Sequence, residues 1–233
     1  MAATYHVSPK VRLARSVLRP LFRLIFYVIS QVKITGKENV PSHGAYLVAV
    51  NHVSLFEAPF ICAFWPKALE ALGAAEIWER PGQSALARLY GGIPVHRGQY
   101  DRHLIETSLA VLRSGYPLAL APEGERSHTP GMQRAQVGIA YLMEKARVPV
   151  VPVGIVGSTE DFLDRALRGE RPAIEMHIGL PLRFPLIEAR GKARREILQH
   201  NADTVMMQIA SMLPPDYRGY YSEYVNDQRK THQ

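Results

Sequence analysis

The chain has 233 residues, of which 47% are hydrophobic; this is enough to bury one sizeable core, and no linker or repeat divides it. Its single cysteine, Cys62, excludes an intramolecular disulfide, and the apolar residues around it indicate a buried thiol. The net charge of +7 favours an anionic partner, either a membrane surface or a nucleic acid.

The first expected element is an amphipathic helix within residues 1–31. At about 100° per residue, four arginines form one narrow stripe and the opposite side is apolar. The arginine stripe consists of Arg12, Arg15, Arg19 and Arg23. The apolar side consists of Ala14, Val17, Leu18, Leu21, Leu24, Ile25 and Val28.

We expect this helix to lie in a membrane interface, with its arginines toward anionic head groups. The longest unbroken apolar run, Leu24 to Ile29, is far short of the roughly 20 residues that span a bilayer. The alternative is an ordinary surface helix packed on the domain.

A buried strand over residues 46–50 leads into Asn51-His52-Val53-Ser54-Leu55-Phe56-Glu57. Open α/β sheets place their chemistry at such strand ends. Inside one straight helix His52 and Glu57 would point about 140° apart, but they can meet across a strand-to-helix turn. A carboxylate that holds one imidazole nitrogen leaves the other free to take a proton from an alcohol. The alternative is a capping box, in which Glu57 bonds the backbone N–H of Ser54 and has no contact with the histidine.

Two more apolar runs end in polar turns. One ends at Arg97, between glycines, and the other, Leu118–Ala121, breaks at Pro122-Glu123-Gly124-Glu125-Arg126-Ser127. A glycine beside an arginine lets backbone N–H groups approach a ligand while the guanidinium clamps an anion. Taken alone, a turn such as residues 122–127 is more often just a polar loop, and the alternative for the Arg97 segment is a strand with a charged exit.

Other chemistries have no motif in this chain. There is no metal-ligand spacing, nucleophile elbow, phosphate loop or dinucleotide fingerprint. We therefore expect no metal or cofactor, and a nucleophile that comes from the substrate.

The remaining residues alternate between helix and strand patterns. Helices are expected over residues 101–115, 132–145, 160–167 and 193–212, and strands over 148–155 and 173–178. Asp101 is the expected cap of the first of these helices, and Gly115 its end. In the last helix the residues expected to face inward are Ile197, Leu198, Val205, Met206 and Ile209. Helices between apolar strands imply an α/β fold with a largely parallel central sheet and helices on both faces.

Four of these segments, in this order, resemble the motifs of the lysophospholipid acyltransferase superfamily, typified by 1-acylglycerol-3-phosphate acyltransferase. The matching segments are Asn51-His52 with Glu57, Ile93-Pro94-Val95-His96-Arg97, Pro122-Glu123-Gly124-Glu125-Arg126-Ser127 and Val150-Val151-Pro152-Val153-Gly154. Two residues depart from the family pattern. Glu57 stands where aspartate is usual, and Glu125 stands where threonine is usual. If Glu125 faces the pocket, its negative charge works against a phosphomonoester head group.

The resemblance implies an O-acyltransferase of phospholipid biosynthesis. Such an enzyme moves a fatty acyl group from acyl-CoA or acyl carrier protein to the free hydroxyl of a lysophospholipid such as 1-acylglycerol-3-phosphate. It implies that His52, oriented by Glu57, is the catalytic base. The residues implied to bind substrate are Arg97, Glu123, Gly124 and Arg126.

On the same resemblance, residues 32–233 form the acyltransferase domain and residues 1–31 hold it on the cytoplasmic face of an anionic membrane, as a peripheral or monotopic protein. Three alternatives stay open. The chain could be a catalytically inert lipid-binding module with the same fold, or an acyltransferase for another lysolipid or a glycolipid. A nucleic-acid-binding protein is the third, although no basic and aromatic binding motif is found.

Overall fold

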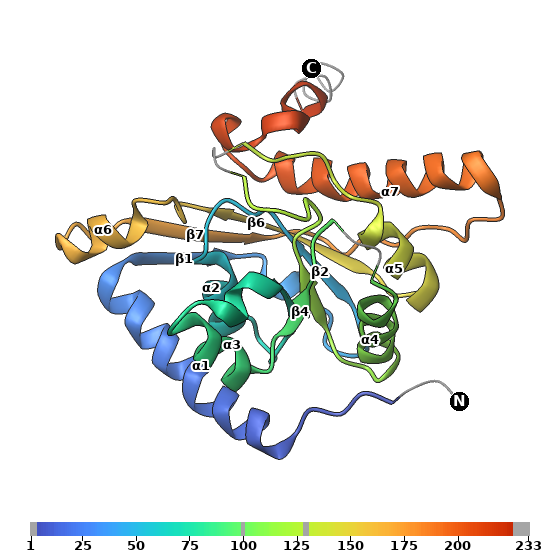
Figure 1. Ribbon diagram of the computed structural model, residues 1–233. Helices are drawn as coiled ribbons and strands as arrows, with labels where there is room; N and C mark the ends of the chain where they lie inside the picture. The colour runs from blue at the N-terminus through green and yellow to red at the C-terminus, as the bar shows by residue number, and fades with distance from the viewer. Residues whose placement is uncertain (1–3, 99–100, 128–130, 226–233) are drawn as a thin grey trace.

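The computed structural model describes residues 4–98, 101–127 and 131–225 (Figure 1). The start of the predicted N-terminal segment, residues 1–3, and the end of the predicted domain, residues 226–233, therefore lie outside the described residues. One sheet holds seven strands in the order β1-β7-β6-β2-β5-β3-β4. The strands are β1 (Gln31–Thr35), β2 (Leu47–Val50), β3 (Glu70–Ala74), β4 (Ile93–Val95), β5 (Leu118–Leu120), β6 (Val150–Val156) and β7 (Ala173–Ile178). Neighbouring strands pair in parallel, except that β6 and β7 are antiparallel. The predicted α/β fold with a largely parallel sheet is confirmed.

Helices cover both faces of this sheet, as predicted (Figure 1). They are α1 (Pro9–Ile29), α2 (Glu57–Phe64), α3 (Gln83–Tyr90), α4 (Arg102–Arg113), α5 (Gly138–Ala146), α6 (Phe162–Leu167) and α7 (Gly191–Ser211). Leu47 of β2 belongs to a core cluster with residues of α4, α5 and α7, and its neighbour Val48 to a second cluster with residues of α1 and α2. Successive strand residues point to opposite faces, so β2 is apolar throughout because both of its faces are covered.

One predicted helix is shorter than expected. The helix expected over residues 132–145 begins only at Gly138. Upstream of it, backbone N–H groups donate to tertiary partners; that of Gln133, for example, donates to the Glu123 carboxylate at 2.7 Å. These bonds replace the i to i−4 bonds that a helix needs. The Asp101 cap is present as predicted, since its carboxylate accepts the N–H of Leu104 at 2.9 Å.

One detail of α7 differs from the sequence-based expectation. Ile197 of α7 is 38% exposed, whereas its neighbour Leu198 and the other three residues expected to face inward are buried. The inward stripe of α7 therefore begins at Leu198. Cys62 is buried, as predicted.

Helix α1 contacts the protein through its arginines, so the predicted orientation of the stripe is wrong for three of its four members. Arg15 is buried, and its guanidinium pairs with the carboxylate of Glu70 in β3, with 2.7 Å between Nη2 and Oε2. Arg19 and Arg23 donate to carbonyl oxygens at the C-terminal end of α2. Such carbonyls have no partner within their own helix and carry partial negative charge. Arg12 is exposed.

The apolar side of α1 faces away from the sheet and its covering helices. Its large exposed side chains, from 39% to 70% exposed, are Leu13, Val17, Leu21, Leu24, Ile25, Tyr27 and Val28. The helix therefore packs on the domain, as the alternative interpretation held, but with its polar side inward. Within the described ranges, no helix is both long enough and apolar enough to cross a bilayer.

Candidate active site

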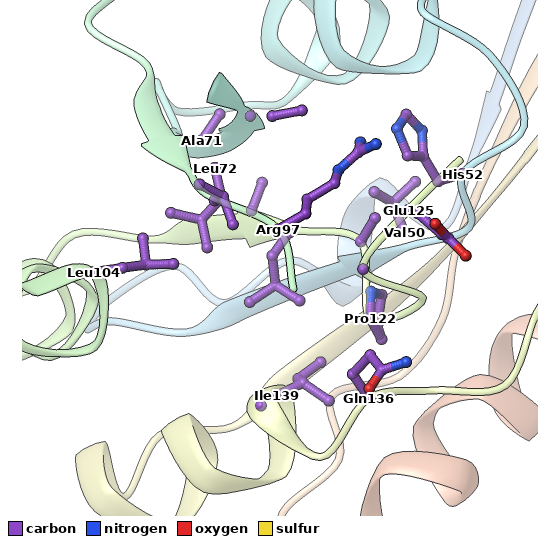
Figure 2. Close-up of a pocket in the computed structure, with 18 of the residues that line it drawn as sticks. Val50, His52, Ala71, Leu72, Arg97, Leu104, Pro122, Glu125, Gln136 and Ile139 are labelled. Atoms are coloured by element: carbon purple, nitrogen blue, oxygen red, sulfur yellow. The ribbon is translucent and has the colours of Figure 1, made fainter. Parts of the chain in front are cut away.

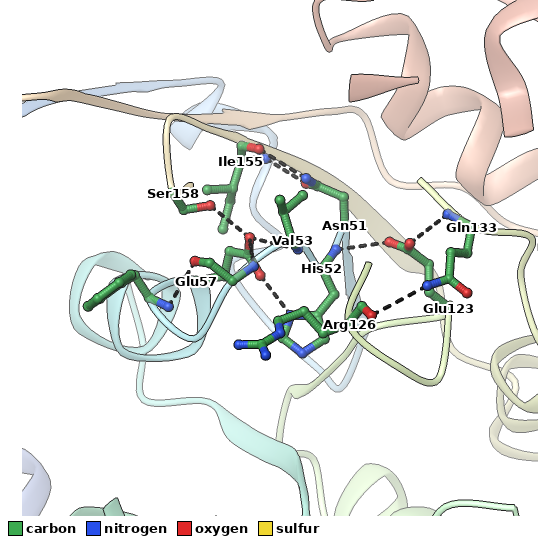
Figure 3. Close-up of polar contacts among 11 residues, drawn as sticks. Asn51, His52, Val53, Glu57, Glu123, Arg126, Gln133, Ile155 and Ser158 are labelled. Atoms are coloured by element: carbon green, nitrogen blue, oxygen red, sulfur yellow. Dashed lines mark hydrogen bonds and ion pairs between the residues drawn. The ribbon is translucent and has the colours of Figure 1, made fainter. Parts of the chain in front are cut away.

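The site begins where β2 ends, at a fully buried asparagine. The side chain of Asn51 pairs with the backbone of Ile155 in β6: its Oδ1 accepts the Ile155 N–H at 2.7 Å, and its Nδ2 donates to the Ile155 carbonyl at 3.0 Å. These two bonds imitate the ladder between neighbouring strands and continue it one residue beyond β2 (Figure 3). The position of His52, the next residue, is therefore set by the sheet itself.

The backbone of His52 is held on both sides by the turn after β5. Its N–H donates to the Glu123 carboxylate at 2.9 Å, and its carbonyl accepts the N–H of Ser127 at 2.9 Å. The other Glu123 oxygen accepts the N–H of Gln133. Glu123 is buried, and burial raises its pKa from 4.5 to about 7, although both backbone donors favour the ionised form. Its carboxylate is thus committed to the backbone and fixes the turn that carries the imidazole.

The predicted contact between the histidine and the glutamate is present. His52 Nδ1 lies 2.7 Å from Glu57 Oε2. The other glutamate oxygen, Oε1, accepts the N–H groups of Val53 and Ser54, each at 2.9 Å, and the hydroxyl of Ser158 at 2.7 Å. The capping-box interpretation is therefore right about the contact with Ser54 but wrong that Glu57 has no contact with the histidine. One oxygen makes the capping-box contact to Ser54. The other meets the imidazole of His52 (Figure 3).

This arrangement fixes which imidazole nitrogen is available. A carboxylate oxygen accepts, so Nδ1 carries the hydrogen and Nε2 has the free lone pair. The His52 side chain is 22% exposed and lines a cavity, whereas the Glu57 side chain is buried. Ser158, which anchors Glu57, belongs to none of the motifs singled out in the sequence. The one signal for it is its place just after the predicted strand over residues 148–155, at the sheet edge where His52 also lies.

The cavity has a volume of about 930 Å³ and is lined from both faces of the sheet (Figure 2). Apolar side chains make up much of its wall, including Ile61, Leu72, Ile77, Leu104, Ile139 and Leu142. Cys62 also lines it, but burial raises the pKa of this thiol to about 11, so it is not an activated nucleophile at neutral pH. The space suits an extended apolar ligand whose reactive end reaches His52.

Five of the six predicted site residues line this cavity: His52, Glu57, Arg97, Gly124 and Arg126. Glu123 is not among its lining residues, because its buried carboxylate accepts the backbone N–H groups of His52 and Gln133. Gly124 has φ of 80°, and an added Cβ would stand 3.1 Å from the Gln136 side chain, so this turn favours glycine.

Charged side chains of both signs face the cavity. Arg97 follows β4, and Glu125 and Arg126 follow β5, so the turns after two strands bring them to the same space as His52. Figure 2 shows Arg97 and Glu125 beside His52. In the described part of the chain these three side chains form no hydrogen bond or ion pair. The described residues also contain no cluster of three His, Cys, Asp or Glu side chains that could hold a metal ion. Besides the base, the turns after β4 and β5 thus supply two guanidinium groups and one carboxylate to the site. Further charged side chains in the cavity lining are Glu76, Arg80, Arg194 and Arg195.

Known proteins share this sequence pattern and fold. A family model described as Acyltransferase matches residues 31–156, a range that contains the six predicted site residues. Uncharacterized proteins of Mycobacterium bovis and Mycobacterium tuberculosis are 29% identical over 158 residues, which are 63% of this chain and 43% of theirs. The chain therefore matches less than half the length of these relatives. The crystal structure of the 1-acyl-sn-glycerophosphate (LPA) acyltransferase PlsC from Thermotoga maritima has the same fold, with a TM-score of 0.58 and 21% identity over 83% of this chain and 81% of that one.

Proposed function

The chain belongs to the acyltransferase family, and from this premise we propose that it is an O-acyltransferase of lysophospholipids. It moves a fatty acyl group from acyl-CoA or acyl carrier protein to the free hydroxyl of a lysophospholipid such as 1-acylglycerol-3-phosphate, in phospholipid biosynthesis. One observation carries this proposal: His52, with Nδ1 held by Glu57, opens onto a largely apolar cavity that the guanidinium groups of Arg97 and Arg126 also line.

The proposed chemistry needs only a base and the two substrates. His52 Nε2 takes the proton of the acceptor hydroxyl while the hydroxyl oxygen attacks the thioester carbonyl carbon. The C–S bond of the resulting tetrahedral intermediate breaks, and the thiolate that leaves takes the proton back from the imidazolium. The products are an ester and a free thiol, with no acyl-enzyme. Glu57 stabilises the imidazolium and keeps Nε2 toward the cavity.

The cavity lining supports the proposed substrates. Arg97 and Arg126 have guanidinium groups with no hydrogen bond or ion pair to any residue that the structure describes, and these groups can hold a phosphate by paired, charge-assisted hydrogen bonds. Gly124 keeps the turn beside them open. The apolar part of the cavity wall suits a fatty acyl chain.

Helix α1 supports a location at the cytoplasmic face of a membrane, bound to one leaflet. Its exposed leucine, isoleucine and valine side chains form one continuous side of a helix, and three of its four stripe arginines, Arg15, Arg19 and Arg23, are already bound to the protein. We propose that this apolar side, rather than the arginine stripe, enters the interface, while the net positive charge attracts anionic lipids.

The direct test is an acylation assay with purified protein, lysophospholipid in vesicles, and either acyl-CoA or acyl carrier protein as donor. Thiol release and the mass of the lipid product are both followed. We expect wild-type protein to release thiol only when the acceptor is present, and to form an ester one acyl group heavier. Lipid binding without thiol release from either donor would instead support the inert lipid-binding module.

A further inference from the structure

Glu125 has a different environment from Glu123, two residues before it on the same turn. The Glu123 carboxylate is buried and accepts two backbone N–H groups. Glu125 is exposed, lines the cavity with His52, and has no hydrogen bond or ion pair in the described part of the chain (Figure 2). A carboxylate without a protein partner, in the space that receives substrate, is available to the ligand.

The cavity thus offers a ligand both kinds of charge within one turn. Arg126 follows Glu125 directly, and Arg97 faces the same space from the turn after β4. No ion pair joins Glu125 to either guanidinium, so the two signs do not neutralise each other within the protein. A head group with one anionic and one cationic group can pair with both, whereas a purely anionic head group meets attraction from the arginines and repulsion from Glu125.

We propose that Glu125 selects the acceptor: it favours a lysophospholipid whose head group joins a singly charged phosphodiester to an ammonium group, over one that ends in a phosphomonoester. This inference rests on the proposed acyl transfer. The arginines hold the phosphate, and Glu125 accepts hydrogen bonds from the ammonium. A phosphomonoester has close to two negative charges at neutral pH and no donor for Glu125.

The test compares three acceptors with the same acyl chain, presented in neutral detergent micelles so that surface charge does not vary. Lysophosphatidylethanolamine has a phosphodiester and an ammonium, lysophosphatidylglycerol has a phosphodiester and hydroxyls, and lysophosphatidate has a phosphomonoester. The variant Glu125→Gln removes the charge and keeps the shape, and Glu125→Lys reverses the charge. Glu79→Gln, an exposed glutamate outside the cavity lining, controls for net charge.

For wild type, kcat/KM should be highest with lysophosphatidylethanolamine. The ratio of kcat/KM with lysophosphatidylethanolamine to kcat/KM with lysophosphatidate should fall about fivefold in Glu125→Gln, mainly through KM. In Glu125→Lys the preference should invert. The ratio should not move in Glu79→Gln. Equal use of the ethanolamine and glycerol lipids by wild type would overturn the ammonium contact. A wild-type preference for lysophosphatidate, or a ratio unchanged in both Glu125 variants, would overturn the whole inference while leaving the acyltransferase proposal intact. If no acceptor is acylated, both proposals fail.

Discussion

Two buried carboxylates, Glu57 in the active site and Glu70 beneath α1, show how differently the same group can be used. Each is almost completely buried. Glu57 is surrounded by two backbone N–H groups, a serine hydroxyl and an imidazole whose second nitrogen reaches a cavity. Glu70 is matched by the guanidinium of Arg15 and the hydroxyl of Tyr5, 2.6 Å away, and burial raises the pKa of that hydroxyl.

The difference lies in what each carboxylate leaves available. At Glu70 the charged partner, Arg15, is itself buried, and neither residue lines the cavity, so the cluster holds α1 in place. At Glu57 the partner ring remains partly exposed with a free lone pair, so burial of the carboxylate fixes a group that can act. Burial of a charge is therefore not a sign of function by itself. What distinguishes the functional carboxylate from the structural one is whether its partner is exposed to a ligand.

The largest effect is expected at the exposed partner. His52→Ala should lower kcat by roughly a hundredfold to ten-thousandfold, because a positioned general base is lost. Its melting temperature should stay near that of wild type, since the backbone of residue 52, not the ring, is held by Glu123 and Ser127. Steady-state assays and thermal unfolding measure the two quantities. Substantial remaining turnover would mean that another group takes the proton.

The two carboxylates can be compared directly by Glu57→Gln and Glu70→Gln. In Glu57→Gln the new amide N–H₂ group faces either the imidazole N–H or a backbone N–H, so donor meets donor and the imidazole loses its charged partner. We therefore expect kcat to fall about a hundredfold. In Glu70→Gln the buried Arg15 loses its charge partner, which should cost about 3–5 kcal/mol of unfolding free energy. Folded Glu70→Gln protein should keep normal turnover.

Urea unfolding and active-site-normalised kinetics on both variants make the comparison. If Glu57→Gln keeps full activity and Glu70→Gln loses it, the roles assigned to the two carboxylates are reversed.

A third buried carboxylate, Glu123, makes the unfolding free energy depend on pH. Burial raises the pKa of Glu123 from 4.5 to about 7, so the folded state holds a proton that the unfolded chain has released. This contribution to stability is complete below pH 4.5 and is lost as pH rises through 7, a fall on the order of 3 kcal/mol. Glu123→Gln does not titrate, so its unfolding free energy should vary less than that of wild type between pH 5 and 7.5. Parallel profiles for the two proteins would contradict this assignment.

The smallest effect concerns the outward side of α1, which the Glu70 cluster helps to hold in place. Leu24→Ser removes one apolar side chain from that side and should weaken binding to anionic vesicles about tenfold. Leu167→Ser changes a leucine on α6 that is more exposed than Leu24, 76% against 61%, and should leave binding unchanged. Vesicle sedimentation measures both. Equal losses in the two variants would mean that α1 has no special part in membrane binding.

Local patterns predicted much of the fold and part of the site. The contact between His52 and Glu57 spans five residues, so spacing and turn geometry showed that it was possible, and the resemblance to the acyltransferase motifs favoured it over the capping box. The supports of that contact are non-local. Asn51 bonds Ile155, and Ser158 bonds Glu57, each about a hundred residues apart in sequence. Those pairings follow from β2 lying beside β6, and strand order cannot be read from a single strand.

Helix α1 shows a different limit of sequence reasoning. Periodicity correctly separated its arginine and apolar sides but says nothing about which side faces the protein. The deciding residue is Glu70, at the start of a short strand that the apolar patterns did not predict. Its carboxylate, and the carbonyl groups at the end of α2 that have no partner within the helix, need hydrogen-bond donors. The arginines of α1 supply these donors.

The two hydrogen bonds that tie the His52 backbone to residues 123 and 127 have a consequence for regiochemistry. Arg126 lies between those residues in sequence, so the proposed phosphate clamp and the proposed base belong to one rigid unit. The separation between the bound phosphate and the hydroxyl that loses its proton is then set by the protein and not by the acyl chains. On a glycerol backbone, where the two candidate hydroxyls differ by one carbon in their distance from the phosphate, such a fixed spacing selects one ester position over the other.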